Sequence, residues 1–110
     1  MIRAVYDTNI LVSGLLWGGK PAQLIDYLWD ERVRLLCLDT LFDEVSRVIK
    51  RDKFTARFQA IGTTPDAFLE NLRRSVEFVT PAEIQPIISE PKDNMVLACA
   101  LGGRADVLIS

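Results

Sequence analysis

The stretch IRAVYDTNIL, residues 2–11, decides the fold, because within a few residues it changes from a strand pattern to a helix pattern. Residues 2–6 form a short apolar run of the kind found in buried strands. The polar residues 7–9 that follow favour a turn and the start of a helix. Apolar side chains then recur at helical spacing as far as Gly18. The chain therefore begins with a strand that passes directly into a helix.

The same alternation continues along the chain. Residues 33–38, 76–79 and 105–109 also have strand character, and helical patterns cover about residues 21–31, 40–51, 53–61, 65–75 and 94–101. Asp39 or Thr40 is the expected N-cap of the third helix, and Asp93 that of the last one. Strands that alternate with helices and show little polar alternation favour a parallel sheet with helices on both faces. We predict one α/β domain over residues 1–110, a three-layer α/β/α arrangement with a central parallel sheet.

The composition is that of an ordinary globular domain, with 49% hydrophobic and 25% charged residues in a chain of 110. No segment approaches the roughly 18 to 20 apolar residues of a membrane helix, and the first residues do not resemble a signal peptide. We therefore expect a cytoplasmic protein without a membrane partner. Cys37 and Cys99 lie far apart in apolar surroundings, and the chain has no histidine. Buried, reduced thiols are expected rather than a zinc site or a disulfide.

The net charge of −2 removes the most general argument for a nucleic-acid partner, so any such partner must use a local patch. Basic residues gather around the third helix and the segment after it, and they could steer an RNA backbone toward Glu44: Arg47, Lys50, Arg51, Lys53 and Arg57. Arg47, Lys50 and Arg51 are the candidate RNA contacts. The favoured alternative is that these side chains form the solvated face of an amphipathic helix.

Three acidic residues stand out by position. Ligand sites of parallel sheets lie outside the carboxyl ends of the strands, and Asp7 directly follows the first strand. Glu44 lies within the apolar stripe of the third helix, where it either meets a cation or reaches water at the edge of the stripe. Asp93 heads the last helix. Taken singly, Asp7 and Asp93 are more simply explained as helix N-caps.

Taken together, these three carboxylates suggest a metal site. Carboxylates that converge in one cleft repel each other unless a cation neutralises them, and ligands that offer only oxygen favour Mg²⁺ or Mn²⁺ over zinc. Such a cation activates a water molecule and orients a phosphodiester, so that no histidine base is required. The pattern therefore indicates hydrolysis of phosphodiester bonds.

The segments DTNILVS (residues 7–13), EVSRV (44–48) and PKDNMVLA (91–98), in this order, resemble the PIN-domain family. More narrowly, the chain is similar to the toxin components of toxin-antitoxin systems, the VapC-like ribonucleases. The resemblance implies Mg²⁺- or Mn²⁺-dependent cleavage of RNA by an endoribonuclease with a parallel α/β sheet. It also implies inhibition by a cognate antitoxin protein. A homodimer is expected as well.

Carried over to this sequence, the resemblance makes Asp7, Glu44 and Asp93 the catalytic, metal-binding acids. Asn9 and Ser13 match polar positions that support the first acid. Asn94 stands where some members of the family have a second acid, so this chain offers an amide at that position.

The chain departs from the family at its end. Family members continue after a strand like residues 105–109 with a Gly-Asp loop that supplies a fourth acid, whereas this sequence stops at Ser110. Asp106 corresponds to a structural position and does not replace that acid. The expectation is thus a C-terminally truncated domain that lacks the final acidic motif, with doubtful two-metal catalysis and an exposed sheet edge.

Two other functions stay open. A truncated domain could be a non-catalytic interaction module that dimerises or binds antitoxin, and the apolar residues 15–17 and 27–29 are candidates for such a contact, although core packing is the simpler explanation. A phosphatase with Asp7 as nucleophile is disfavoured. Such an enzyme would be expected to carry a second acid at the position of Asn9.

Overall fold

The computed structural model describes residues 1–82 and 91–109, and residues 91–94 by their backbone alone. Strands β1 (Ile2–Tyr6), β2 (Val33–Cys37), β3 (Val76–Phe78) and β4 (Val107–Ile109) form one sheet in the order β3-β2-β1-β4. Every pair of neighbouring strands is parallel. The predicted α/β class with a central parallel sheet is confirmed, and each strand lies within its predicted segment.

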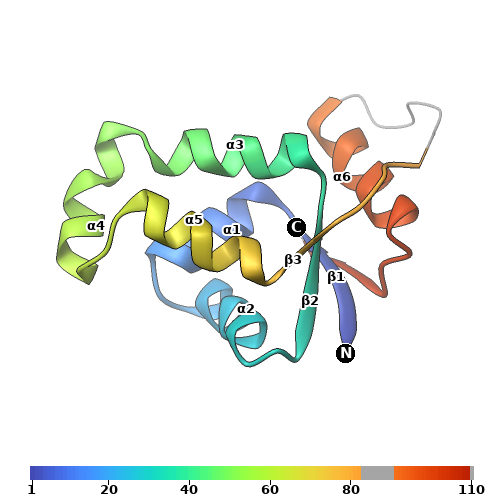
Figure 1. Ribbon diagram of the computed structural model, residues 1–110, viewed down its shortest axis with the longest axis horizontal. Coiled ribbons are helices and arrows are strands. Elements are labelled where there is room, and N and C mark those ends of the chain that lie inside the picture. Colours follow the sequence, from blue (N-terminus) through green and yellow to red (C-terminus); the bar gives the residue numbers. More distant parts are fainter. Residues whose placement is uncertain (83–90, 110) are drawn as a thin grey trace.

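Helices cover both faces of this sheet. They are α1 (Thr8–Leu16), α2 (Lys20–Trp29), α3 (Asp39–Ile49), α4 (Thr55–Ile61), α5 (Pro65–Arg74) and α6 (Pro91–Gly102), with a short 3-10 turn η1 (Asp52–Phe54). Figure 1 shows α6 on one side of the strands and α1, α2 and α5 on the other. Helix α3 starts where β2 ends and extends away from the sheet above α1 and α5 (Figure 1).

The core is built on the two central strands. Their buried side chains include Val5 and Leu35, which are exposed by no more than 1%. Cys37 on β2 and Cys99 on α6 are both buried, as predicted. Burial disfavours the thiolate and raises the pKa of Cys37 to about 12 and that of Cys99 to about 11. No helix in the described part of the chain is long and apolar enough to cross a membrane.

Two helix starts differ from the prediction. Helix α3 already begins at Asp39, so the N-cap position belongs to Leu38 and not to Asp39 or Thr40. Helix α6 begins at Pro91, which places Asp93 inside the first turn rather than at the N-cap. Proline favours the first helical position because its φ angle is preset and its missing N–H is not needed there. A carboxylate in the first turn is still favourable, since it faces the positive end of the helix dipole.

The junction between α4 and α5 follows the sequence prediction. Gly62 ends α4 with a left-handed φ of 75°, which glycine adopts without steric cost. The Thr64 hydroxyl accepts a hydrogen bond from the Ala67 backbone N–H at 3.2 Å, and Pro65 opens α5. A stop followed by a capped start is therefore confirmed at residues 62–65.

Strand β4 forms one edge of the sheet, as expected for the last strand. It pairs with β1, and its residues Val107 and Leu108 are 42% and 44% exposed. Just before it, the Asp106 carboxylate accepts a hydrogen bond from the Arg3 backbone N–H at 2.9 Å, and its own N–H donates to the Arg3 carbonyl. Asp106 thus fastens β4 to β1.

Candidate active site

Asp7 lies where the carboxyl ends of two strands meet. Its backbone N–H donates to the carbonyl oxygen of Ile109 at 2.8 Å, which joins the end of β1 to the end of β4. Its side chain caps α1, because Oδ1 accepts a hydrogen bond from the Asn9 backbone N–H at 3.0 Å. The N-cap role is therefore real. It engages one of the two carboxylate oxygens and fixes the side chain at this edge of the sheet.

Glu44 comes to the same region from α3. It is half-buried beside the buried Leu41 and Val45, so it lies at the edge of the apolar stripe. The hydroxyl of Thr8, a buried residue, makes a long hydrogen bond of 3.5 Å to Glu44 Oε2. Since Thr8 directly follows Asp7, the packing of α1 against α3 brings the surroundings of both acids together.

A cleft of about 270 Å³ opens beside this contact. It is lined by Thr8, Asn9, Val12, Ser13, Glu44, Val48, Arg51, Lys53 and Phe54. Four of the residues singled out in the sequence, Asn9, Ser13, Glu44 and Arg51, therefore share one cavity. Sequence reasoning missed Thr8, whereas it placed Lys53 in the basic cluster that could steer an RNA backbone. The cleft combines a carboxylate with amide and hydroxyl groups, and it has two cationic side chains.

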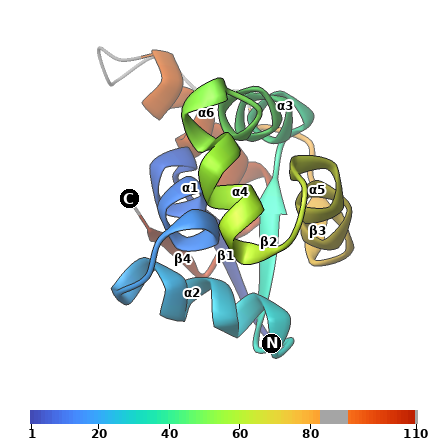
Figure 2. The ribbon, with the colours of Figure 1, turned by 90° about the vertical axis from the view of Figure 1, so that its left-hand side faces the viewer.

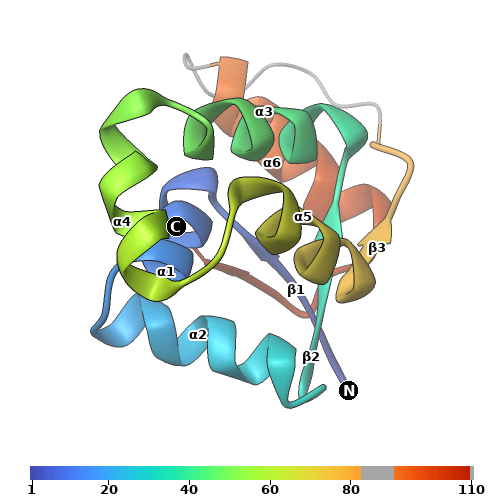
Figure 3. The same ribbon diagram turned by 60° about the vertical axis from the view of Figure 1, so that its left-hand side comes forward.

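The third acid is placed by its backbone alone. Asp93 and Asn94 lie in the first turn of α6, and their side chains are outside the described part of the structure. In Figures 2 and 3, as in Figure 1, the beginning of α6 lies at the same end of the molecule as α3. Among the side chains that are described, no group of three or more acidic or other metal-binding residues could hold a metal ion.

The chemistry of the donors nevertheless fits a hard divalent cation. Asp7, Thr8 and Glu44 offer only oxygen atoms, which are the ligands that Mg²⁺ and Mn²⁺ prefer. The two thiols do not compete, because Cys37 and Cys99 are buried and keep their protons. A site for such a cation at this edge would combine Asp7 and Glu44 with a further ligand, and Asp93 is the predicted one.

The basic residues near α3 separate into different environments. Lys50 Nζ forms an ion pair with Asp66 Oδ1 of α5 at 3.2 Å. Arg57 donates to the Leu16 carbonyl oxygen, and its guanidinium lies over the ring of Trp17. Arg47 is exposed and does not line the cleft. Of the three predicted RNA contacts, Arg51 is thus the one that shares the cavity with Glu44.

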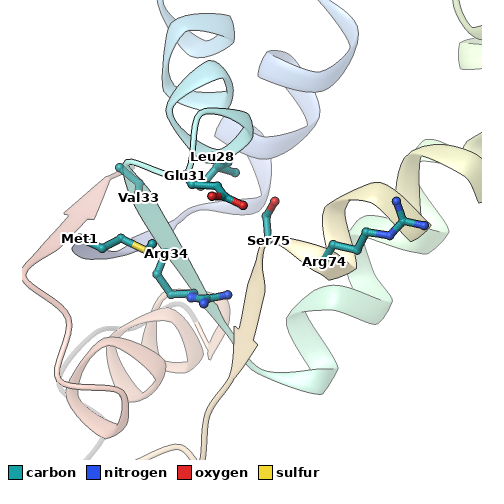
Figure 4. A pocket seen from close by; sticks show the side chains of 7 residues that line it. All are labelled: Met1, Leu28, Glu31, Val33, Arg34, Arg74 and Ser75. Carbon is teal, nitrogen blue, oxygen red and sulfur yellow. The ribbon is translucent and has the colours of Figure 1, made fainter.

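A second depression lies at the opposite edge of the sheet, where the strands begin. It has a volume of about 160 Å³ and is lined by Met1, Leu28, Glu31, Val33, Arg34, Arg74 and Ser75. Figure 4 shows the Glu31 carboxylate facing the Ser75 hydroxyl, whereas Arg74 points away. With one carboxylate and two arginines, this depression does not have the ligand set of a divalent cation site.

The predicted apolar contact surface is only partly exposed. Leu15, Leu16 and Leu28 are buried in the core, so their assignment to a surface is wrong, and the simpler core explanation holds for them. They point inward because they belong to the faces of α1 and α2 that pack together. Trp17, Tyr27 and Trp29 remain, with exposures of 50%, 41% and 40%. A contact with a partner would rest on these three aromatic side chains.

Comparison with known proteins identifies the family of this chain. A family model described as the PIN domain matches residues 3–110. None of the curated proteins and none of the solved structures matches the chain significantly. The match spans all but the first two residues, includes the segments that carry Asp7, Glu44 and Asp93, and shows that the chain belongs to the PIN-domain family.

Proposed function

We propose that this protein is a metal-dependent endoribonuclease that hydrolyses RNA phosphodiester bonds, with Asp7, Glu44 and Asp93 as its catalytic acids. PIN-domain proteins are generally nucleases. The observation that carries the proposal is the contact between Thr8 and Glu44, since it joins the motif that begins at Asp7 to the acid on α3. We infer that the acids meet at the carboxyl edge of the parallel sheet, where such folds bind their ligands.

Mg²⁺ or Mn²⁺ is the proposed cofactor, held by Asp7, Glu44 and Asp93. A bound divalent cation would lower the pKa of a water molecule and offset the negative charge that develops on the phosphate oxygens. The donors support this choice, because they are all oxygen atoms and include no histidine.

The neighbouring side chains hold the acids in place. The Thr8 hydroxyl steadies Glu44, and the hydrogen bond from the Asn9 backbone N–H orients the carboxylate of Asp7. The side chains of Asn9 and Ser13 line the cleft and can hydrogen-bond to a phosphate or a ribose hydroxyl of the substrate. Both residues therefore have a supporting role in this proposal, and Asn94 is a third candidate.

The test is cleavage of an end-labelled single-stranded RNA in Mn²⁺ or Mg²⁺, with EDTA as the metal-free comparison. We expect the chain to cut only with the cation, and Asp7→Asn and Glu44→Gln to abolish cleavage. Asp43→Asn is a matched control, because Asp43 is an exposed acid next to Glu44 on the same helix. Equal cleavage by Glu44→Gln and Asp43→Asn, or none by the unaltered chain, would refute the proposal.

The more specific role that we propose is that of a cytoplasmic toxin which forms a homodimer and is inhibited by an antitoxin. Its support is the motif resemblance and the exposed aromatic residues Trp17, Tyr27 and Trp29. Induced expression in bacteria should then arrest growth, and the Asp7→Asn variant should not. Normal growth with the active nuclease would contradict the toxin role and leave the nuclease proposal intact.

A non-catalytic interaction module is the alternative. One observation favours it: the apolar edge strand β4 is partly exposed. An exposed apolar edge is a common place for association with another chain. This alternative becomes the better explanation if the purified chain dimerises but neither binds a divalent cation nor cuts RNA.

A further inference from the structure

Only some of the basic side chains around the third helix face the cleft. Of the basic residues between positions 47 and 57, Lys50 is paired with Asp66, and Arg57 is held by the Leu16 carbonyl. Arg51 and Lys53 line the same cavity as Glu44. The fold thus places only two of these basic side chains, Arg51 and Lys53, at the cleft.

Local structure explains why Arg51 lies beside Glu44. Glu44, Val48 and Arg51 are spaced at i, i+4 and i+7, which places them on one side of a helix. Helix α3 ends at Ile49, but the Arg51 backbone N–H still donates to the Val48 carbonyl at 3.2 Å. The helical turn therefore continues far enough to carry Arg51 to the cleft.

Lys53 reaches the cleft by a different route. It lies in the 3-10 turn η1, and the buried side chain of Phe54 anchors that turn in the core. Its Nζ atom lies 5.1 Å from the centroid of the Phe54 ring, a cation-π distance that limits the freedom of the lysine. Asp52, the neighbouring acid, does not line the cleft. Lys53 is thus held at the cavity.

The positive charges of Arg51 and Lys53 at the cleft favour an anionic ligand. Within the described part of the chain, neither Arg51 nor Lys53 has an ion-pair partner, although the protein carries a net charge of −2. Arginine and lysine side chains beside polar groups are typical contacts of a phosphate backbone. The cleft is small, about 270 Å³, so we take a single strand rather than a duplex as its ligand.

We propose that Arg51 and Lys53 bind the phosphate backbone of a single-stranded RNA and guide it along the cleft to Glu44. This inference rests on the proposed function, because it takes RNA as the substrate. It narrows the predicted basic cluster to the two residues that share one cavity with Glu44.

The experiment measures the binding of fluorescein-labelled decauridylate in EDTA, so that neither a metal nor cleavage contributes. The double variant Arg51→Gln/Lys53→Gln is compared with Arg47→Gln/Lys50→Gln, which removes the same charge from the same region. For a single strand, each phosphate contact contributes about −0.7 to the slope of log K against log salt concentration. We expect Arg51→Gln/Lys53→Gln to make this slope shallower by about 1.4 and to weaken binding about tenfold or more. Arg47→Gln/Lys50→Gln should change the affinity less than about twofold.

Three results would overturn the inference: no RNA binding by the unaltered chain, an unchanged salt slope in Arg51→Gln/Lys53→Gln, or an equal loss in Arg47→Gln/Lys50→Gln. The first result would point to a different occupant, such as an acidic segment of a protein partner. All four substituted residues are exposed, so the variants are expected to fold. Circular dichroism and thermal unfolding are the check.

The failure of this inference can be told apart from the failure of the proposed function. Metal-dependent cleavage with an unchanged KM in Arg51→Gln/Lys53→Gln would refute the phosphate contacts and leave the nuclease in place. RNA binding that depends on Arg51 and Lys53, without cleavage in Mn²⁺, would refute the nuclease and support the contacts.

Discussion

Asp7 combines two roles that substitution can separate. Its carboxylate caps α1 through the Asn9 backbone N–H, and its charge is proposed to hold a cation. Asp7→Ala removes both roles and should destabilise the protein by about 1 kcal/mol, whereas Asp7→Asn keeps a capping oxygen and should change stability little. Urea unfolding of the three proteins without metal measures the difference. Equal destabilisation by alanine and asparagine would show that the cap does not explain the place of Asp7.

The ion pair between Arg3 and Glu77 predicts a response to acid. Arg3 Nη1 and Nη2 donate to the two carboxylate oxygens of Glu77 at 3.0 and 2.7 Å, and this lowers the pKa of Glu77 below its ordinary value of 4.5. A lowered pKa in the folded state adds stability above pH 4.5, and that stability is lost as the pH falls through the lowered pKa.

Glu77→Gln should therefore be less stable than the unaltered protein at pH 7, and the difference should shrink towards pH 3. Urea midpoints at both pH values provide the measurement. Glu70→Gln is the control, since Glu70 makes an exposed contact of 3.9 Å with Arg74 one helical turn away. A difference that stays constant between pH 7 and pH 3 would contradict the role given to the Glu77 charge.

Single residues of the site could be predicted in part. The order of the motifs and the helical position of Glu44 were enough to select Asn9, Ser13 and Glu44, which share one cleft. The choice between Lys50 and Lys53 could not be predicted. Lys50 is engaged by Asp66, which lies on a different helix, and no local pattern encodes that pairing.

At the level of elements, Gly14 controls how closely α1 and α2 approach. A Cβ atom at this position would lie 2.5 Å from Ile25 Cγ1 and 2.6 Å from the Pro21 carbonyl oxygen, and the latter cannot move without its backbone. Gly14→Ala should therefore destabilise the protein by about 1 to 3 kcal/mol or more, as overpacking does. Denaturant unfolding tests this expectation.

Gly18 provides the matched control for Gly14. A Cβ atom there would meet nothing within 4 Å, and its φ lies outside the left-handed region. Gly18→Ala should leave stability unchanged or raise it by less than about 1 kcal/mol, because alanine restricts the unfolded chain. If both substitutions had the same effect, the close approach of α1 and α2 would not be what requires Gly14.

The positions of the strands and helices were largely predictable, because strand runs and amphipathic patterns differ clearly in period. Helix starts were less so. The N-cap of α3 is Leu38, and α6 begins at Pro91, whereas the prediction placed the caps on the nearest acidic residue. An acid is nearly as favourable in the first turn as at the cap, so composition does not distinguish the two positions.

At the level of the whole molecule, the two cysteines report on global unfolding. Cys37 lies on β2 and Cys99 on α6, and both are buried where the helix packs on the sheet. Iodoacetamide should modify neither thiol in the folded protein at pH 8 within minutes and should modify both in urea, as mass spectrometry would show. Rapid modification of the folded protein would contradict the packing of α6 on the sheet.

The same thiols predict a loss of stability at alkaline pH. Their pKa values rise from 9 to about 12 and about 11 in the folded state, so the unfolded chain releases these protons first. Stability from the two groups is complete below pH 9 and falls as the pH rises through these values. A Cys99→Ala variant should show a smaller loss between pH 8 and pH 10 than the unaltered protein.

The α/β class could be predicted from the alternation of strands and helices alone. The strand order β3-β2-β1-β4 could not, because it depends on which strands pair across the whole chain. The candidate site could be anticipated only as a set of acids expected at one sheet edge. The position of Arg51 and Lys53 in the same cleft as Glu44 could not be predicted, because it depends on the folded turn after α3.

The central claim is that Asp7 at the end of β1, Glu44 on α3 and Asp93 on α6 share one divalent cation. Calorimetric titration with Mn²⁺ tests it without interference from contaminating ribonucleases. We predict saturable binding of Mn²⁺ by the unaltered chain and its loss in each of Asp7→Asn, Glu44→Gln and Asp93→Asn, while Asp43→Asn binds normally. Absence of binding by the unaltered chain, or normal binding by the three variants, would contradict the account.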